Sequence, residues 1–236
     1  MNIAIILAGG MGKKMGIADI PKQFIDVYGK PLLVHTLESF EFHQDIDSIA
    51  VVCQDEWKED VMIWIRKYDL NKVKWIVSSG ETRQKSAYNG LTEIADYAGD
   101  EDIVIIHDAS RPLVTHRIIS DNIKMAKLYE AVDTVIPSED TIIISQDEKV
   151  ISEVPLKKCV YIGQTPQSFK YKVITKAHKD AEFKEIVNAT DDCQLILGQG
   201  KNVYLVKGDK LNLKISTFED IVLLKAIIKM GKIEVN

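Results

Sequence analysis

Short apolar runs alternate with segments of helical spacing through the first half of the chain. Four runs predict strands, at residues 3–7, 47–53, 73–77 and 103–106, and the first and last of them are apolar throughout, which is the pattern of a fully buried strand. Between the first two, Leu33, Leu37 and Phe40 fall on one face of a helix that begins near Pro31. Strands and helices that alternate in this way form βαβ units, so the pattern predicts an α/β fold with a mainly parallel sheet flanked by helices.

Further apolar positions predict which side chains face the core. A helix over residues 83–95 would turn Ala87, Leu91 and Ile94 inward, and Thr115 can cap the helix that follows the fourth strand. Five residues at helical spacing are assigned to the core rather than to stacking on a base: Trp57, Val61, Trp64, Ile65 and Tyr68.

The pattern changes after residue 130. Residues 131–137 form a strand, and residues 141–145 and 149–154 flank a polar turn, which predicts a β-hairpin. Its first strand places isoleucine on both faces, and a protruding hairpin of this kind needs a cover. The cover is either the rest of the domain or the same arm of a second subunit.

The remaining segments return to the alternating pattern. The main domain resumes with residues 164–169, helices are expected near 171–180 and 191–198, and a strand is expected at 203–206. Ser216 and Glu219 form a capping box for a last helix that stops at Gly231. With no internal repeat and no linker, the chain is expected to be a single domain over 1–236 with an arm at about 138–160.

Composition narrows the functional class. The net charge of −5 argues against nucleic acid as a partner, and the three cysteines show no metal or disulfide spacing. The first apolar run is too short to span a membrane and leads directly into glycines. The sequence therefore predicts a cytoplasmic protein that binds a small ligand.

Three polar stretches follow predicted strands, at 8–14, 78–86 and 107–112. In parallel sheets ligands bind beyond the carboxyl ends of the strands, so these stretches should converge on one site.

The first stretch is rich in glycine and lysine. Gly9, Gly10 and Gly12 allow close approach of backbone N–H groups, and Lys13, Lys14 and Lys22 add positive charge, which favours a polyphosphate. The alternative is a tight turn with solvated lysines. Neither common glycine motif fits, because GxGxxG meets Met15 and the P-loop pattern meets Leu7 and Lys14.

Six segments together resemble a known family. LAGGMGKKMG followed by PKQF resembles the opening of nucleotidyltransferases that activate sugars and polyols, and PKQ is typical of the cytidylyltransferases. HDASRP, GETRQKS, QTPQ, TDD and NxK, at 107, 80, 164, 190 and 212, match further segments of the polyol-phosphate cytidylyltransferases. The resemblance implies a Rossmann-like nucleotidyltransferase fold, a homodimer joined by the arm, and CTP, a polyol phosphate and Mg²⁺ as ligands.

The resemblance also implies roles for individual residues. Nucleotide binding falls to Leu7, Ala8, Gly9, Gly10, Met11, Gly12, Gly80, Arg83, Ser86 and Asp108. Binding of the polyol phosphate falls to Arg111, Thr141, Lys157, Thr165 and Thr190. Lys14, Lys22 and Lys214 would be catalytic, and Asp108 would hold Mg²⁺, which needs only one or two carboxylates beside phosphates. From the residues alone, Asp108 could instead be a helix cap beside a surface arginine.

Four positions depart from the family pattern. Lysine stands at 14 and 157 where the family commonly has arginine, although Lys158 is an alternative match in the arm. Lysine keeps the charge but loses the planar fork that grips phosphate. Ser79 and Ala87 stand where glycine and valine are usual.

Two branches of the family differ in their acceptor. GI-x-D-x-PKQF, the AVDTV run at 131–135 and Gly163 before QTPQSF favour ribitol 5-phosphate over methylerythritol phosphate. Two other classes stay open: a nucleotide-binding regulator without turnover, and a dehydrogenase. The second lacks the acid expected about 20 residues after the glycine loop, since Asp55 is about twice as far away.

Overall fold

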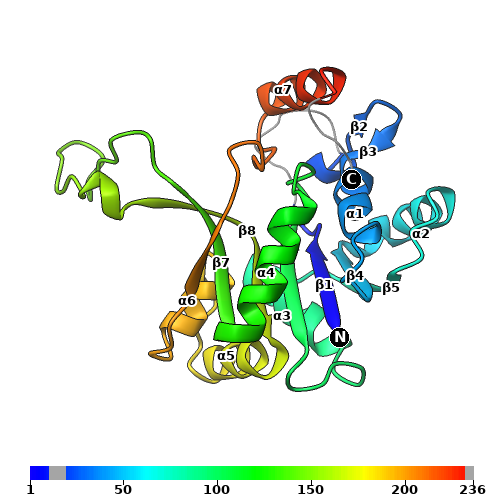
Figure 1. Cartoon of the computed structure of the whole chain (residues 1–236), viewed down its shortest axis with the longest axis horizontal. Coiled ribbons are helices and arrows are strands. Elements are labelled where there is room, and N and C mark those ends of the chain that lie inside the picture. Colours follow the sequence, from blue (N-terminus) through cyan, green and yellow to red (C-terminus); the bar gives the residue numbers. More distant parts are fainter. Residues whose placement is uncertain (11–19, 232–236) are drawn as a thin grey trace.

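A seven-stranded sheet runs through the protein, and helices cover both of its faces (Figure 1). The structure is a computed structural model that describes residues 1–10 and 20–231. The strands of this sheet are β1 Asn2–Leu7, β4 Ser48–Cys53, β5 Val73–Ser78, β6 Ile103–Asp108, β7 Ala131–Pro137, β8 Tyr161–Lys170 and β9 Tyr204–Lys207. The helices are α1 Leu32–Glu41, α2 Lys58–Lys67, α3 Arg83–Glu93, α4 His116–Tyr129, α5 Tyr171–Phe183, α6 Asp192–Leu197 and α7 Phe218–Lys229.

The strand order is β5-β4-β1-β6-β8-β7-β9, with β8 antiparallel to both of its neighbours. The other strands run in one direction, because β9 pairs in parallel with β7. The predicted α/β class with a mainly parallel sheet flanked by helices is confirmed. The carboxyl ends of β1, β4, β5 and β6 therefore meet at one edge, as ligand sites of such sheets require.

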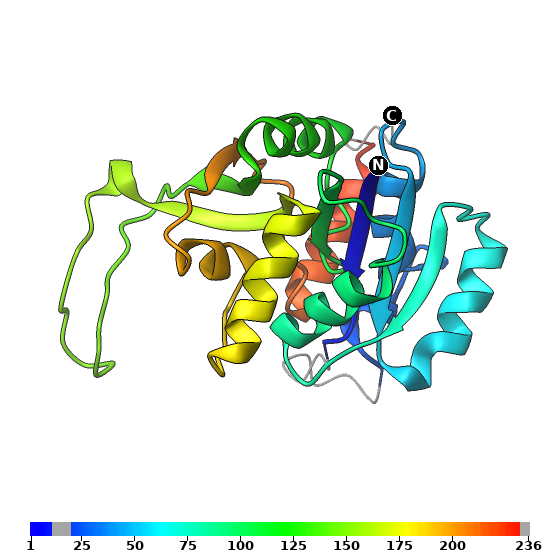
Figure 2. The ribbon, with the colours of Figure 1, turned by 90° about the horizontal axis from the view of Figure 1, so that it is seen from below.

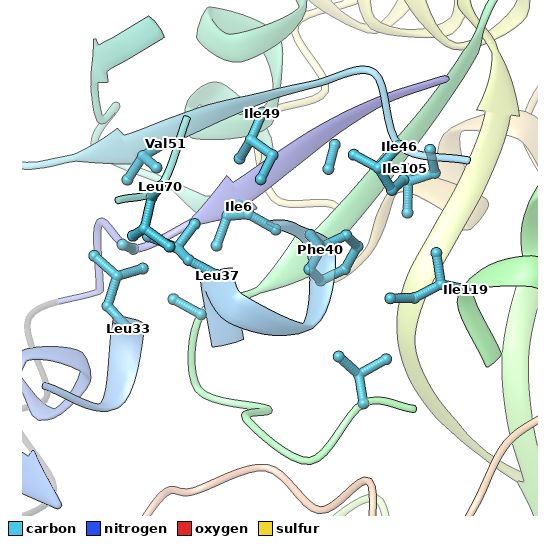
Figure 3. Close-up of a cluster of buried hydrophobic side chains, with 14 of the residues drawn as sticks. Ile6, Leu33, Leu37, Phe40, Ile46, Ile49, Val51, Leu70, Ile105 and Ile119 are labelled. Carbon is cyan, nitrogen blue, oxygen red and sulfur yellow. The ribbon is translucent and has the colours of Figure 1, made fainter. Parts of the chain in front are cut away.

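Two hydrophobic clusters sandwich the sheet. On one face α1, α2 and α4 pack on alternate strand residues, among them Ile6, Ile49 and Ile105, with Phe40 and Leu37 of α1 fully buried (Figure 3). On the other face α3, α5 and α6 pack on Ile5 and Val104 and their neighbours. Both faces of the central strands are buried, which explains why these strands have continuous apolar sequences.

The predicted aromatic group belongs to the core. Val61 is fully buried, and Trp57, Trp64, Ile65 and Tyr68 pack against the first cluster. Trp57 lies in the short 3-10 helix η2 (Asp55–Trp57) before α2, and its ring stacks on Phe24 with centroids 4.6 Å apart. None of these rings lines the pocket described below.

The last helix is capped one residue later than the sequence indicated. Thr217 caps α7 and Asp220 completes the capping box, so the prediction of Ser216 and Glu219 was wrong by one position. The preceding backbone explains the shift, because the Ile215 N–H donates to the Ser110 carbonyl and Ile215 is fully buried. Because this hydrogen bond holds the Ile215 backbone against Ser110, the helix can begin only after Ser216. Gly231 ends the helix with a positive φ, as predicted.

The segment between β7 and β8 leaves the body of the protein as an arm, on the side of the sheet away from α2 (Figures 1 and 2). It turns at Asp147, as predicted, since the N–H groups of Lys149 and Val150 donate to the Asp147 carboxylate. The two predicted strands are reduced to one bridge between Ile144 and Glu153. An isolated two-stranded ribbon is only marginally stable in water, which accounts for the lost ladder.

The described helices include none with the length and apolar character that a membrane span requires. The single-domain boundaries and the cytoplasmic location stay predictions.

Candidate functional site

A pocket of about 260 Å³ lies at the carboxyl ends of β1 and β6. The three predicted stretches converge on it, and it is lined by Leu7, Gly9, Gly10, Lys22, Gln23, Gly80, Glu81, Thr82, Arg83, Ser86, Asp108, Ala109, Ser110 and Lys214. Nine of the residues to which the family resemblance assigns a binding or catalytic role are in this lining. Met11, Gly12 and Lys14 lie outside the described residues.

The described part of the glycine loop is held from two sides. A Cβ atom on Gly9 would lie 2.4 Å from Cβ of Ser79, so the loop touches the segment after β5 and only glycine fits. The buried Gln23 side chain donates through Nε2 to the carbonyls of Ala8, at 2.5 Å, and Gly10, at 3.0 Å. Ala8 is buried and continues the sheet ladder, donating to the Val52 carbonyl.

The amino end of α3 forms the opposite wall. Thr82 caps the helix by accepting from the Lys85 N–H at 3.1 Å. Ser86 Oγ accepts from the Gly80 N–H at 3.0 Å, which shapes the backbone before the helix. A helix amino terminus and the facing glycine loop both offer N–H groups and positive potential, a combination suited to phosphate.

Asp108 is the acidic centre of the pocket, and both of its oxygens face cations. Oδ2 lies 2.7 Å from Lys214 Nζ, and Oδ1 lies 3.5 Å from Arg83 Nε. Burial alone would raise the pKa of Asp108, but Lys214 and Arg83 outweigh it and hold that pKa well below its usual value. Asp108 is therefore ionised at neutral pH, and its role as a simple helix cap is not what the geometry favours.

Behind the pocket, Arg83 belongs to a buried charged chain. Its Nη1 donates to Asp192 Oδ2 at 2.6 Å, and His178 Nε2 lies 2.9 Å from Oδ1 of the same carboxylate. The side chains of Asp192 and His178 are each 1% exposed. Burial opposes ionisation of Asp192, but Arg83 and His178 lower its pKa. Asp192 thus fixes the guanidinium that faces Asp108.

Replacing Asp192 with alanine is expected to cost about 3–5 kcal/mol of unfolding free energy, because it leaves the largely buried Arg83 without its closest partner. Since the folded pKa of Asp192 is lowered, its stabilisation is present above the unfolded pKa near 3.9 and is lost as the pH falls below it. Urea unfolding at pH 7 measures the cost. Asp121→Ala is the matched control: it removes the exposed ion pair with Arg117, for which less than about 1 kcal/mol is expected. Equal losses of unfolding free energy in the two variants would contradict the role of Asp192 as the buried partner of Arg83.

Two residues predicted to bind the acceptor lie just beyond Asp108. Arg111 is buried, and its Nη1 donates to the Asn212 carbonyl at 2.7 Å. Thr165 Oγ1 accepts from the Asp108 N–H at 3.1 Å and lies 3.0 Å from His107 Nδ1. Burial lowers the pKa of His107 to about 4, so the ring is neutral and supports Thr165 and the Arg111 carbonyl rather than adding charge.

The other three predicted acceptor residues lie away from this pocket. Thr190 is exposed, and its hydroxyl donates to the Gln194 side chain of α6. Thr141 and Lys157 are exposed on the arm, where Lys157 lies in the short helix η3 (Lys157–Cys159) and donates to the Glu139 carbonyl. In a single chain these arm residues take no part in the pocket lining.

The family model described as IspD, 2-C-methyl-D-erythritol 4-phosphate cytidylyltransferase, matches residues 2–230. The chain belongs to the IspD family. A curated ribitol-5-phosphate cytidylyltransferase of Vibrio parahaemolyticus serotype O3:K6 is 37% identical over 228 residues, covering 97% of this chain and 96% of that protein. The resemblance inferred from the motifs is confirmed, and the protein is a nucleotidyltransferase of the cytidylyltransferase type.

Solved structures of the IspD family share this fold. The 4-diphosphocytidyl-2C-methyl-D-erythritol synthase of Anaerococcus prevotii has a TM-score of 0.82 at 28% identity, covering 97% of this chain and 96% of that one. The Francisella tularensis 2-C-methyl-D-erythritol 4-phosphate cytidylyltransferase has a TM-score of 0.80 at 27% identity, covering 96% and 99%. The predicted Rossmann-like nucleotidyltransferase fold is confirmed.

The structure shows residues that hold the glycine loop and Arg83 in place and that the family motifs did not single out. Gln23, Asp192 and His178 were given no role from the sequence, although Gln23 stands in the PKQ segment and Asp192 in TDD. His178 had no signal, because it sits among the apolar positions of α5 and its partner lies 14 residues away.

Proposed function

We propose that the protein is a Mg²⁺-dependent CTP:ribitol-5-phosphate cytidylyltransferase that forms CDP-ribitol and pyrophosphate as a precursor for teichoic acid or capsule. The observation that carries the proposal is the pocket in which the glycine loop, the amino end of α3 and the Asp108–Lys214 pair meet. The choice of ribitol 5-phosphate is supported by the 37% identity to the Vibrio enzyme that is named for it.

The reaction is an in-line displacement at phosphorus. A phosphate oxygen of the polyol phosphate attacks the α-phosphorus of CTP, the new P–O bond forms, and the bond to the β-phosphate oxygen breaks to release pyrophosphate. A phosphate monoester is already anionic near neutrality, so the step needs no general base. Catalysis then consists of positioning and charge stabilisation.

The residues singled out by the family motifs would supply both. The Gly9 and Gly10 amides would hold the β- and γ-phosphates, as would Met11 and Gly12 of the same loop. Lys22 and Lys14 would stabilise charge at the α-phosphorus. Lys214 would act on the acceptor side, with Arg111 and Thr165 binding the acceptor's phosphate. The rest of the nucleotide would be bound by Leu7, Ala8, Gly80, Arg83 and Ser86.

Asp108 is suited to a Mg²⁺ ion shared with substrate. Mg²⁺ is commonly bound by one or two carboxylates together with phosphates and water. The described residues contain no cluster of three or more metal-ligating side chains, so the phosphates of CTP would have to complete the coordination. The bound ion would neutralise phosphate charge, and Lys214 would turn from Asp108 toward the phosphates while Arg83 keeps its bond to Asp192.

We further propose that the arm joins two subunits. Six apolar side chains of the arm are each at least 37% exposed, and such an exposed apolar patch is unfavourable in water. They are Ile142, Ile143, Ile144, Val150, Ile151 and Val154. The same arm of a second copy would cover them and would bring Thr141 and Lys157 to the other subunit.

Replacing Ile143 with lysine is expected to weaken dimerisation at least about tenfold, because a charge would be buried in an apolar contact. Sedimentation of the wild type and the variant over a concentration series measures the effect. Phe183→Lys is the control, since Phe183 is 90% exposed at the end of α5 and lies outside the arm. An unchanged dimer constant in the Ile143 variant would exclude the arm as the interface.

Pyrophosphate release tests the proposed reaction. The protein is mixed with CTP and Mg²⁺, and ribitol 5-phosphate and methylerythritol phosphate are offered in separate reactions. Turnover with ribitol 5-phosphate alone is expected. Turnover with methylerythritol phosphate alone would replace the acceptor and keep the mechanism. CTP binding without turnover on either would favour a nucleotide-binding regulator.

A further inference from the structure

Asp133 is an acid that the proposed chemistry leaves without a role. It lies in β7, in the AVDTV run, at the root of the arm. Its backbone pairs with Gln167 on β8, and the register of the two strands shifts immediately afterwards, between Asp133 and Val135. Irregular pairing of this kind often redirects side chains beside functional sites.

One oxygen of Asp133 is held from within the protein. Gln167 Nε2 donates to Oδ1 at 3.0 Å, and Gln167 Oε1 accepts from the Asp192 N–H at 3.2 Å. Asp192 in turn binds Arg83 of the pocket. The carboxylate is therefore fixed on the sheet face that α6 covers, next to the chain of groups that leads to Asp108.

The other oxygen faces Gly163 on β8. A Cβ atom placed on Gly163 would lie 3.8 Å from Asp133 Oδ2, and apart from Gly163 and its two chain neighbours no other heavy atom of the described residues would be within 4 Å. An open space therefore adjoins Oδ2, and it exists because residue 163 has no side chain.

Charged groups from three further elements surround Asp133. Arg83 of α3, Arg111 after β6 and Asp191 at the cap of α6 interact with it electrostatically. Arg83 Nη2 and Arg111 Nε are buried, and neither has a hydrogen-bond partner in residues 1–10 and 20–231. Buried donors without partners are costly, so these two nitrogens are available to bond a polar ligand near Asp133.

We propose that Asp133 is the residue that recognises the polyol chain of the acceptor, accepting a hydroxyl hydrogen bond in the space above Gly163. This inference rests on the proposed function and assigns a specificity residue to it. The phosphate end would lie at Arg111, because Asp133 repels it, and the hydroxyl-bearing chain would extend toward the carboxylate.

The arrangement favours an unbranched polyol. A carboxylate accepts a strong hydrogen bond from a hydroxyl group. A methyl group placed against Asp133 Oδ2 would displace water from that oxygen and would offer no hydrogen bond in its place. Sites built to bond a substrate hydroxyl reject analogues that lack it more strongly than apolar pockets reject an extra methyl group. Asp133 would therefore act against methylerythritol phosphate as well as in favour of ribitol 5-phosphate.

Titration of Asp133 offers a second signature. Burial, reinforced by Asp191, raises the pKa of Asp133 to about 6, against the opposing effects of Gln167 and Arg83. The carboxylate loses its charge as the pH falls through that value, so the KM for ribitol 5-phosphate should rise more steeply toward pH 5 in the wild type than in Asp133→Asn. The variant is the necessary reference, because the substrate phosphate itself titrates near pH 6.

The principal experiment compares Asp133→Ala and Gly163→Ala with the wild type. Removing the carboxylate should lower kcat/KM for ribitol 5-phosphate by ~10–150-fold, with the KM for CTP within twofold. Gly163→Ala should raise the acceptor KM without loss of folding, because its Cβ meets nothing closer than 3.8 Å. Glycerol 3-phosphate, which lacks the outer hydroxyl-bearing carbons of ribitol 5-phosphate, serves as an inhibitor whose inhibition constant should change less than twofold in both variants.

Asp96→Ala is the matched control, since Asp96 is exposed and follows the carboxyl end of α3, whose amino end lines the pocket. Thermal unfolding reports whether each variant folds, and Asp133→Asn and Gly163→Ala keep the test open if Asp133→Ala does not. An unchanged acceptor KM and unchanged preference over methylerythritol phosphate in folded variants would overturn the role of Asp133 alone. A wild type that does not use ribitol 5-phosphate would instead overturn the proposed function.

Discussion

Replacing Asp108 with asparagine is expected to lower kcat by ~10³-fold while the protein remains folded. The substitution keeps the shape of the side chain but removes the negative charge that faces both Lys214 and Arg83 in the pocket. It would weaken the binding of Mg²⁺ and would release Lys214 from its ion pair with residue 108. Arg83 keeps Asp192, and the Lys214 side chain is 44% exposed, so neither cation is left buried without a partner.

The measurement is pyrophosphate release over a range of Mg²⁺ concentrations, with Asp100→Asn as an exposed control. The variant should need more Mg²⁺ for half-maximal rate. The wild-type rate should show no step from Asp108 between pH 6 and 8, because its neighbouring cations hold the pKa of Asp108 far below that range. A variant with wild-type kcat at low Mg²⁺ would remove Asp108 from the metal site.

Replacing Lys22 with alanine should lower kcat by ~10²–10³-fold, with a smaller change in the KM for CTP. Lys22 lines the pocket at the start of the short helix η1 (Lys22–Phe24). That helix is anchored by Gln23 on the glycine loop and by Phe24, whose ring stacks on Trp57. The truncation therefore removes the ammonium group and leaves its support in place, so that the loss falls on the transition state.

Steady-state kinetics with CTP and ribitol 5-phosphate measure the effect, and Lys74→Ala on the exposed side of β5 is the control. A Lys22→Ala enzyme within about twofold of wild-type kcat would exclude Lys22 from catalysis. Lys22→Arg should retain part of the rate, because the charge remains although its geometry differs.

Much of the fold could be predicted because its signals are local. The central strands are buried on both faces, so their apolar runs mark them directly, and the strand at 131–137 was predicted with the bounds that β7 has. The alternation of strands and helices then placed three polar stretches at one edge of the sheet, and the pocket lining includes all three.

Predictions that depended on long-range contacts were less accurate. The cap of α7 moved from Ser216 to Thr217 because Ile215 is bound to Ser110, more than 100 positions earlier in the chain. The hairpin strands of the arm had suitable residues but lack the neighbouring surface that would order them. Local pattern carries no information about either circumstance.

The sequence by itself determined the sheet, the family and the residues that converge on the pocket. These follow from apolar periodicity and from motifs whose residues are close together in the chain. Only the tertiary structure decided that Asp192 and His178 hold Arg83, that both oxygens of Asp108 face cations, and that Asp133 opens onto Gly163. The physical reason is that charge, burial and pKa depend on distances between groups 14 to 109 positions apart, which only folding brings together.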